Sequence, residues 1–256
     1  MSRSPRVDYD KIAPLWDSQP YRSKSLDPQL VAFLEERAVR TSLRALDIGC
    51  GTGSQLIANR AAAPNAQMIG VDQSFGMLGA ARRKAPDIAW VRADAAALPF
   101  AAASFDFIGC QFAFHHFGDQ HGMLAETLRL LRPGGRFVLR NMCPEECPDW
   151  LCYEYFPAAW AADLRDFWPA AKVMATMEAT GFAAVSVAYE HIHFEQNLSD
   201  WLDHVRHRYT CSQLQAIANV DYMAGVQRLK AELAAATMPR VRADHLCLVT
   251  IRGEKR

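Results

Sequence analysis

The chain between residues 43 and 141 alternates short apolar runs with stretches whose apolar residues recur at helical spacing. This alternation is typical of βαβ units around a parallel sheet. Ser74 is placed to cap the helix that follows the second apolar run, and "RPGG" is placed to end the helix before the fifth. The strands expected from the pattern are 43–49, 66–72, 88–94, 105–112 and 136–141.

Segments on both sides of this region add further elements. Upstream, "LDPQLVAFLEERA" predicts a helix with Asp27 at its N-cap. Downstream, an aromatic-rich segment is followed by a predicted helix over 170–180, which Gly181 ends, and by an alternating strand over 183–195. A second helical stretch, with Ser199 as a possible cap, precedes the last apolar run, "HLCLVTI".

Composition and charge narrow the class of protein. The chain has 256 residues, of which 50% are hydrophobic, and this is enough for one well-cored domain. Its formal net charge is zero, which favours neither nucleic acid nor an anionic membrane as a partner. There is no apolar leader and no run near the roughly 18 to 20 apolar residues that span a bilayer. We therefore expect a cytoplasmic protein with no membrane and no nucleic-acid partner.

The seven cysteines are scattered and lack the CxxC spacing of a zinc knuckle, which indicates reduced thiols. Their closest grouping is Cys143, Cys147 and Cys152 in "MCPEECPDWLC". No metal site is expected, although this trio leaves a soft-metal or metalloid site open as an alternative.

The first strand leads into a glycine loop with Gly49, Gly51 and Gly53, and Asp47 comes just before it. A dinucleotide-binding loop reads GxGxxG, whereas here the third glycine falls one place early. An acid beside a pyrophosphate is also unfavourable, so a nicotinamide-dependent oxidoreductase is disfavoured. A ligand with positive charge and no phosphates, such as S-adenosylmethionine, suits Asp47, which attracts its ammonium group directly or through water.

The chain resembles the class I S-adenosylmethionine-dependent methyltransferases in four segments: "LDIGCGTG", "GVDQSFGML", "RADAAALPFAAASFD" and "LRLLRPGGRFVL". Within that class it is similar to the ubiquinone/menaquinone-biosynthesis type of small-molecule methyltransferase. The resemblance covers residues 43–141 and the closing strand. It implies an α/β fold: a Rossmann-like, seven-stranded, mostly parallel sheet with an antiparallel last strand, helices on both faces and helical cap insertions.

We expect a single methyltransferase domain over residues 1–256. Its expected parts are an N-terminal lid at 1–27, a cofactor-binding core at 43–141, substrate-side cap insertions at 142–168 and 197–240, and a closing strand at 246–252.

The resemblance implies roles for two acidic residues at strand ends. Asp72, which ends the second strand, accepts hydrogen bonds from both ribose hydroxyls, as a carboxylate can. Asp94, which follows the third strand, accepts from the adenine amino group, and the loop glycines lie under the methionine moiety. The alternative for each acid is an ordinary turn residue.

Four more residues complete the expected cofactor site. The backbone N–H of Ala95 is directed to the adenine ring, and Gln111 lies near the methionine end. Met77 and Leu98 pack on the two faces of adenine, although apolar residues there also suit the core.

The reaction implied is an in-line displacement of methyl from a sulfonium, which mainly requires aligned reactants and excluded water. A phenol, hydroxyl or amine acceptor is helped by a base, and histidine suits this task. His115 and His116 lie just past the fourth strand. We expect one of them to line the site, the alternative being a ring that caps a turn or packs under phenylalanines.

Residues that could bind the acceptor come from four segments outside the core. Aromatic and basic side chains suit a flat, hydrophobic or anionic acceptor, yet aromatics at helical spacing often form core instead. The lid candidates also include Tyr9 and Trp16. The expected acceptor-binding residues are Tyr21, Arg22, Tyr153, Phe156, Trp160, His193, Arg206 and Tyr209.

The favoured hypothesis is an enzyme that uses S-adenosyl-L-methionine to methylate an oxygen or nitrogen of a small, aromatic or hydrophobic metabolite. One alternative is a metalloid methyltransferase that uses the three clustered cysteines. Another is a protein that binds the cofactor without catalysis. The sequence leaves the acceptor, the atom methylated and the oligomeric state open.

Overall fold

The computed structural model describes residues 7–18, 24–37 and 43–256. The chain divides into two compact units. Of the described residues, the sheet unit comprises those within Tyr9–Asn141, Ala170–Ala188 and Thr250–Arg256. The helical unit comprises Met142–Pro169 and Tyr189–Val249, together with residues 7 and 8. Both predicted insertions fall in the helical unit, while the single-domain organisation stays a prediction.

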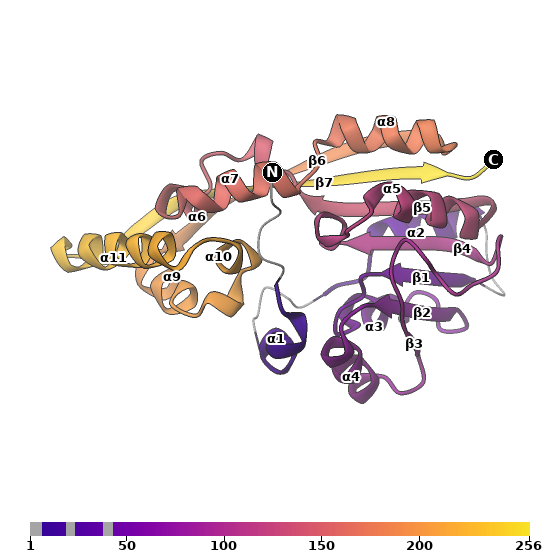
Figure 1. The fold of residues 1–256 in the computed structure, drawn as a ribbon, viewed down its shortest axis with the longest axis horizontal. Helices are drawn as coiled ribbons and strands as arrows, with labels where there is room; N and C mark the ends of the chain where they lie inside the picture. The colour runs from indigo at the N-terminus through magenta and orange to yellow at the C-terminus, as the bar shows by residue number, and fades with distance from the viewer. Residues whose placement is uncertain (1–6, 19–23, 38–42) are drawn as a thin grey trace. The chain divides into compact units, whose positions relative to one another are not determined.

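Seven strands form one sheet in the order β3-β2-β1-β4-β5-β7-β6 (Figure 1). The five strands from β3 to β5 pair in parallel, which confirms the predicted βαβ arrangement. The order reverses between β1 and β4, where open parallel sheets bind their ligands. The strands are β1 Arg44–Ile48, β2 Gln67–Asp72, β3 Ala89–Arg92, β4 Phe105–Gln111, β5 Leu131–Met142, β6 Ala183–Asn197 and β7 Val241–Glu254.

The last three strands of the sheet order are longer than the pattern predicts. β7 runs antiparallel to β5, because Gly134 N donates to Lys255 O at 2.7 Å and Cys143 N to Cys247 O at 2.9 Å. The predicted antiparallel last strand is therefore confirmed. The helix before β5 ends at Leu130, and "RPGG" begins the strand because this backbone pairs with the end of β7.

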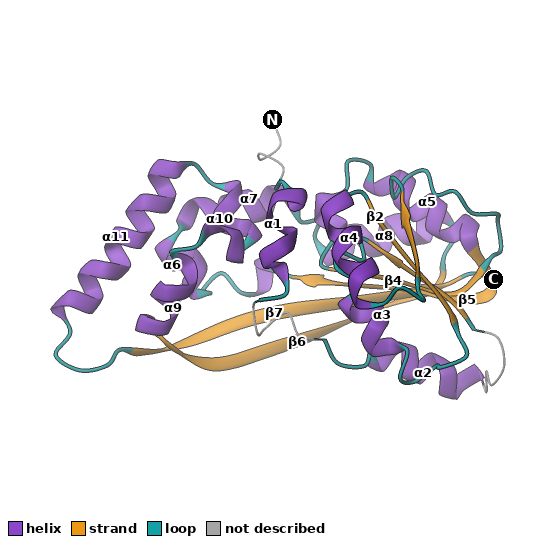
Figure 2. Cartoon of the chain, turned by 90° about the horizontal axis from the view of Figure 1, so that it is seen from below, coloured by secondary structure: helices purple, strands orange, loops and turns teal. Residues whose placement is uncertain are grey.

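Helices cover both faces of the sheet unit, with α5 and α8 on one face and α2 and α3 on the other (Figure 2). Three residues predicted to cap or end helices do so. Asp27 Oδ1 accepts from Gln29 N at 2.9 Å at the start of α2, and Ser74 caps α4. Gly181 follows α8 with φ of 114°. The helices are α1 Tyr9–Trp16, α2 Pro28–Arg37, α3 Ser54–Asn59, α4 Phe75–Lys84, α5 Gln120–Leu130 and α8 Ala170–Thr180.

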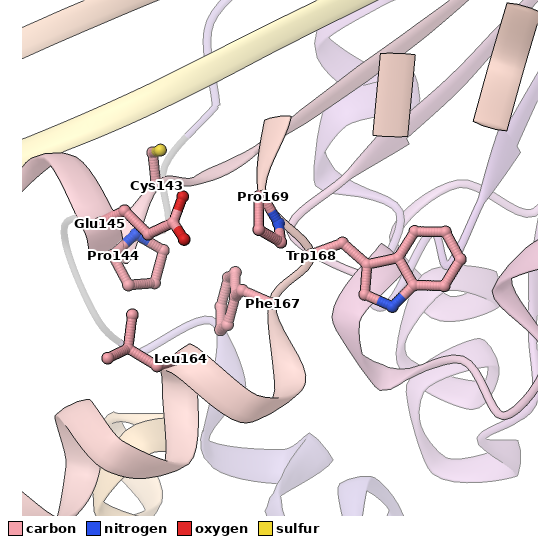
Figure 3. Close-up of a pocket in the computed structure, with 7 residues that line it drawn as sticks. All are labelled: Cys143, Pro144, Glu145, Leu164, Phe167, Trp168 and Pro169. Atoms are coloured by element: carbon pink, nitrogen blue, oxygen red, sulfur yellow. The ribbon is translucent and has the colours of Figure 1, made fainter. Parts of the chain in front are cut away.

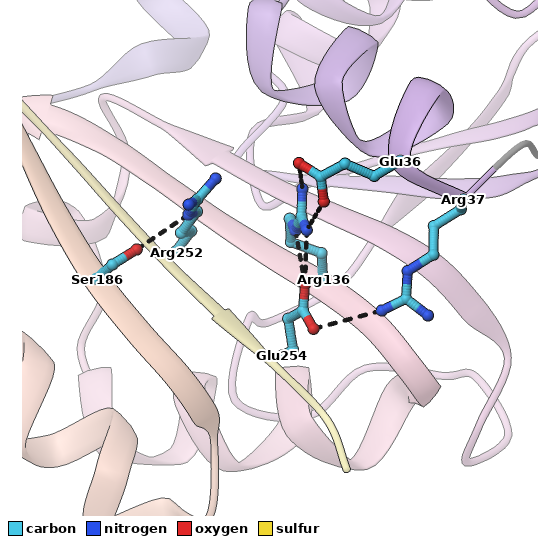
Figure 4. A network of polar contacts seen from close by, with 6 residues as sticks. All are labelled: Glu36, Arg37, Arg136, Ser186, Arg252 and Glu254. Carbon is cyan, nitrogen blue, oxygen red and sulfur yellow. Dashed lines mark hydrogen bonds and ion pairs between the residues drawn. The ribbon is translucent and has the colours of Figure 1, made fainter.

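A buried arginine on β5 links α2 to β7 through two ion pairs. The Arg136 side chain on β5 is 5% exposed and pairs with Glu36 of α2 at 2.5 Å and with Glu254 of β7 at 2.6 Å (Figure 4). Arg37 also reaches Glu254, at 3.3 Å. The buried charge is thus compensated from two elements, as a buried arginine requires.

The helical unit packs short helices around aromatic side chains. Asn197, at the end of β6, caps α9 by accepting from Ser199 N at 2.9 Å, so the prediction of Ser199 as the cap was wrong. Asn is a stronger N-cap when its side chain reaches the first turn. The helices are α6 Leu151–Tyr155, α7 Pro157–Asp166, α9 Leu198–Val205, α10 Ser212–Ala216 and α11 Asn219–Ala235. Within the described parts of the chain, no helix is long and apolar enough to cross a membrane.

Three single 3-10 turns complete the described elements. They are η2 Phe114–His116, η3 Pro144–Glu146 and η4 Arg208–Thr210.

Candidate cofactor-binding site

The glycine loop leaves the C-terminal end of β1, and all three glycines have positive φ. Two of them allow close packing, since a Cβ at Gly49 would lie 2.4 Å from Ala113 Cβ and one at Gly53 would lie 2.2 Å from the Trp90 ring. A Cβ at Gly51, in contrast, would meet no atom within 4 Å. The loop therefore presents open space at Gly51 alone of the three, where a ligand can approach the backbone.

Asp72 at the end of β2 joins this loop to the next helix. Its carboxylate accepts from Gly51 N at 2.9 Å and from Ser74 N at 2.8 Å. Burial raises the pKa of Asp72, while these backbone hydrogen bonds oppose the rise. The side chain is partly exposed, so its carboxylate lies at the surface of the open space.

Asp47 is buried at 6% exposure in the middle of the parallel sheet. Burial raises its pKa to about 7, the charge of Lys24 opposes this rise, and the charges of Asp27 and Asp72 add to it. Among the described residues no hydrogen bond to this carboxylate contributes to its pKa. Such a carboxylate attracts a positive ligand group that comes near it.

A small cavity with apolar and polar lining residues lies against Asp47. It measures about 10 Å³, room for roughly one water molecule. One wall is a hydrogen-bonded group in which Gln111 Nε2 donates to Asp27 Oδ2 at 3.0 Å and Asn59 Oδ1 accepts from Asp27 N at 2.9 Å. Gln111 thus lies beside Asp47, at the expected methionine end.

The expected adenine residues lie in three local environments. Asp94 is exposed and accepts from Ala96 N at 3.0 Å, which is an Asx turn. Ala95 is 4%, Leu98 5% and Met77 1% exposed. Core packing on α4 is enough to explain the burial of Met77. The adenine contacts of Asp94, Ala95, Leu98 and Met77 stay predictions.

The helix α1 lies on the loop and on α4. Asp10 accepts from Gly76 N at 2.8 Å and from Ser74 Oγ at 2.6 Å. Asp17, just past the other end, accepts from Thr52 Oγ1 at 2.7 Å and pairs with Lys84 at 2.7 Å. Neither acid was predicted from the sequence, although an acid facing the N-terminus of a helix is a recognised stabilising position. Two expected residues, Tyr21 and Arg22, lie outside the described residues.

The two adjacent histidines have different partners. His116 Nε2 lies 2.6 Å from the Tyr9 hydroxyl, and the Tyr9 ring also meets the Trp16 ring edge-on. His115 Nδ1 lies 3.3 Å from Asn141 Nδ2, so this ring nitrogen accepts from the amide. Burial, and next the neighbouring His116, lowers the pKa of His115 well below its usual range. His115 is therefore a neutral ring, and His116 is the one joined to the N-terminal helix.

The aromatic residues expected to bind the acceptor lie mostly in the core of the helical unit. Phe156 is fully buried and stacks on Tyr222 with centroids 6.1 Å apart. Tyr153 is buried and donates to Asp163 Oδ2 at 2.8 Å. Trp160 is 37% exposed at the edge of this cluster. Core packing therefore accounts for Phe156 and Tyr153, and we do not propose them as acceptor-binding residues.

The other expected residues of this unit are more exposed. The His193 ring stacks on His245 with centroids 4.5 Å apart. Arg206 pairs with Asp203 at 3.1 Å, and Tyr209 is half-buried against His207. Their side chains are accessible, and their roles stay predictions.

The cysteine trio of the metalloid alternative does not assemble. Cys152 contacts Cys211, whereas Cys143 contacts Cys247. In the described part of the chain, no group of three His, Cys, Asp or Glu side chains is arranged to hold a metal ion. A cavity beside Cys143, closed by Leu164, Phe167 and Pro169, measures about 10 Å³ and is too small for an acceptor (Figure 3). The structure does not favour the alternative.

Comparisons with known proteins agree with this geometry. Residues 46–139 match the methyltransferase domain family. The chain is 31% identical to a demethylmenaquinone methyltransferase of Beutenbergia cavernae over 67% of its own length and 65% of the relative's. It spans from 48% to 65% of the length of the first curated relatives that it matches.

Solved structures share the fold. The YcgJ protein of Bacillus subtilis matches with a TM-score of 0.59 at 21% identity, over 89% of this chain and 97% of that one. Phosphoethanolamine N-methyltransferase 2 of Haemonchus contortus, solved with S-adenosyl-L-methionine, matches with a TM-score of 0.57 at 19% identity, over 97% of this chain and 60% of that one. The loop with open space at Gly51 and acids on either side fits the same cofactor. The chain therefore contains, over residues 46–139, a methyltransferase domain of the kind that class I S-adenosylmethionine-dependent methyltransferases share.

Proposed function

We propose that this protein transfers a methyl group from S-adenosylmethionine to an oxygen or nitrogen of a small, hydrophobic or aromatic metabolite. The observation that carries the proposal is the open space at Gly51, bordered by the carboxylate of Asp72 and close to the buried carboxylate of Asp47. When bound, the cofactor supplies an electrophilic methyl group on a sulfonium. Two acids beside the glycine loop suit a cation of this kind.

His116 and Tyr9 are proposed to handle the acceptor's proton. The 2.6 Å contact between the Tyr9 hydroxyl and His116 Nε2 allows Tyr9 to pass its proton to the ring while it takes one from the acceptor. His115 stays neutral because its pKa is lowered well below the usual range, so it places no competing charge beside His116. Tyr9 and His116 would thus leave the acceptor atom deprotonated for the methyl group that a bound S-adenosylmethionine would supply.

The proposed proton relay is the reason for proposing oxygen or nitrogen as the atom that is methylated. A base beside the reacting atom is useful when the nucleophile carries an ionisable proton, as a phenol, hydroxyl or ammonium group does. A small acceptor is also supported by the names of the relatives, which specify a demethylmenaquinone and a phosphoethanolamine N-methyltransferase. Trp160, His193, Arg206 and Tyr209 remain the proposed acceptor contacts from the helical unit, as exposed or half-buried side chains.

The test is transfer of isotopically labelled methyl from S-adenosylmethionine to a pooled extract of small metabolites. The wild type is expected to label an organic-extractable compound, and the labelled atom is then assigned by NMR. His116→Asn is expected to lower kcat by roughly 10²–10⁴-fold, the usual contribution of a general base. Tyr9→Phe is expected to lower it less, with the affinity for S-adenosylmethionine unchanged in both.

The matched control is His121→Asn, which changes an exposed histidine on α5. This variant is expected to turn over at the wild-type rate. Label found only in protein or nucleic acid would contradict the small-molecule acceptor. Full activity of His116→Asn would contradict the proton relay.

A further inference from the structure

Two cysteines of the helical unit have their thiols in contact. Cys152 lies on α6 and is 2% exposed, in the hydrophobic cluster against which Cys211 packs. The Cys152 thiol is hydrogen-bonded to the Cys211 thiol. Cys211 lies between η4 and α10, and its Sγ also donates to Gln213 Oε1 at 3.0 Å. The helical unit therefore brings together two sulfur atoms that are far apart in the sequence.

Cys211 differs from the other six cysteines in both exposure and acidity. It is half-buried, whereas the other six are buried. The hydrogen bond from Cys152 lowers the pKa of the Cys211 thiol, and the backbone N–H of Leu214 acts in the same direction, while burial opposes both. Because the thiolate is the reactive form of a cysteine, Cys211 is expected to react first. Burial instead raises the pKa of five other thiols, those of Cys50, Cys110, Cys143, Cys147 and Cys247.

We propose that Cys211 and Cys152 form a peroxide-oxidisable pair, in which Cys211 is the attacking thiol and Cys152 the resolving thiol. In the first step the Cys211 sulfur attacks one oxygen of hydrogen peroxide, so that an S–O bond forms and the O–O bond breaks. The hydroxide that leaves takes the thiol proton and becomes water. The sulfur is thereby oxidised to a sulfenic acid while the peroxide is reduced.

The second step closes a disulfide between the two cysteines. The Cys152 sulfur attacks the sulfenic sulfur of Cys211, the S–S bond forms and the S–O bond breaks. Hydroxide leaves with the Cys152 proton as a second molecule of water. A reducing thiol reverses the change by thiol–disulfide exchange.

The disulfide changes how the helical unit is held together. It joins α6 to the turn before α10 and closes a long loop of the chain, and such a cross-link favours the folded over the unfolded state. It also removes the S–H that Gln213 Oε1 accepts, while Ser212 Oγ still donates to that oxygen at 3.1 Å. Neither thiol takes part in the proposed methyl transfer, so the pair can be tested without a methyl acceptor.

The test treats the whole chain with hydrogen peroxide, counts its thiols in denaturant and maps linked peptides by mass spectrometry without reduction. The wild type is expected to lose two of its seven thiols, to yield peptides linked through Cys152 and Cys211, and to regain both thiols with dithiothreitol. Cys152→Ser is expected to stop at a sulfenic acid on Cys211, which dimedone traps. Cys211→Ser is expected to lose thiols at least roughly tenfold more slowly.

Cys143→Ser is the matched control, because it removes one thiol of the other contacting pair, Cys143 and Cys247. It is expected to form the link between Cys152 and Cys211 at the wild-type rate. A first link between Cys143 and Cys247, or an unchanged rate of thiol loss in Cys211→Ser, would overturn the proposal. Absence of the link between Cys152 and Cys211 in the wild type, whether or not thiols are lost, would overturn it as well.

Discussion

The C-terminal edge of β1, β2 and β4 and the aromatic cluster of the helical unit use their side chains in opposite ways. At the sheet edge, Asp47 is a buried acid, Asp72 is a half-buried acid that accepts from Gly51 N, and the space beside Gly51 is open. In the helical unit, Phe156 and Tyr153 are buried members of the same hydrophobic cluster. Buried charge without full pairing points to a ligand, whereas buried aromatic surface is explained by folding itself.

The largest expected effect is on the stability of the helical unit. Phe156→Ala removes a fully buried ring packed against Trp201 and Tyr222, and is expected to cost about 3–5 kcal/mol in the free energy of unfolding. Affinity for S-adenosylmethionine should stay within twofold. Chemical denaturation and calorimetry measure the two quantities. An unchanged free energy of unfolding with a raised KM for the acceptor would place Phe156 in the site after all.

The next effect is on the sheet edge. Asp72→Ala removes the proposed ribose contact and the acceptor of the Gly51 and Ser74 N–H groups, and is expected to weaken cofactor binding by at least roughly 100-fold. Asp87→Ala, which removes an exposed acid paired with Arg60, is the control and is expected to bind normally. Similar affinities of the two variants would remove the ribose contact from the account.

A smaller effect concerns pH. Burial raises the pKa of Asp47 to about 7, so this carboxyl is largely protonated below neutral pH and ionised above it. Because the ionised form attracts the ligand's ammonium, affinity for S-adenosylmethionine is expected to rise roughly tenfold between pH 6 and pH 8. Asp47→Asn, which cannot ionise, should flatten this dependence. An affinity that falls over the same range would mean that Asp47 does not serve the ammonium.

The raised pKa of Asp47 also has a consequence for stability in the absence of ligand. An acid whose pKa is higher in the folded than in the unfolded state favours folding when it is protonated. The free energy of unfolding should therefore decrease as pH rises from about 4 to 7. Cofactor binding should offset this loss, and thermal unfolding followed with and without S-adenosylmethionine measures both.

The smallest expected effect is on stability, at the N-cap of α9. Asn197→Ala removes the N-cap of α9 and is expected to cost about 1 kcal/mol in the free energy of unfolding. Ser199→Ala, at the position that the sequence analysis considered as the cap, is expected to cost less than about 0.5 kcal/mol. The reverse order of the two effects would contradict the capping geometry.

The comparison also explains which parts of the molecule could be predicted from sequence. The strands, the caps at Asp27 and Ser74, the end of α8 at Gly181 and the glycine loop follow from local rules that tie residue type to backbone conformation. The fold of the sheet unit was accordingly predicted almost completely. Asn197 was missed because Asn and Ser are both good caps, and only the point where the strand ends decides between them.

The acceptor side was less predictable, because aromatic residues serve both cores and pockets. Nothing in "DWLCYEYFPAAWAADLRDFWP" distinguishes Phe156, which is buried, from Trp160, which is partly exposed. Asp17 was missed for a related reason. Its contact to Thr52 is made with a residue far away in sequence.

The most direct test of the central claim, that the glycine-loop edge binds S-adenosylmethionine, is competitive calorimetric titration of the wild-type protein with S-adenosylmethionine and NAD. We expect one S-adenosylmethionine to bind per chain with micromolar affinity, and NAD not to displace it. Tighter binding of NAD, or no heat of binding with S-adenosylmethionine, would contradict it.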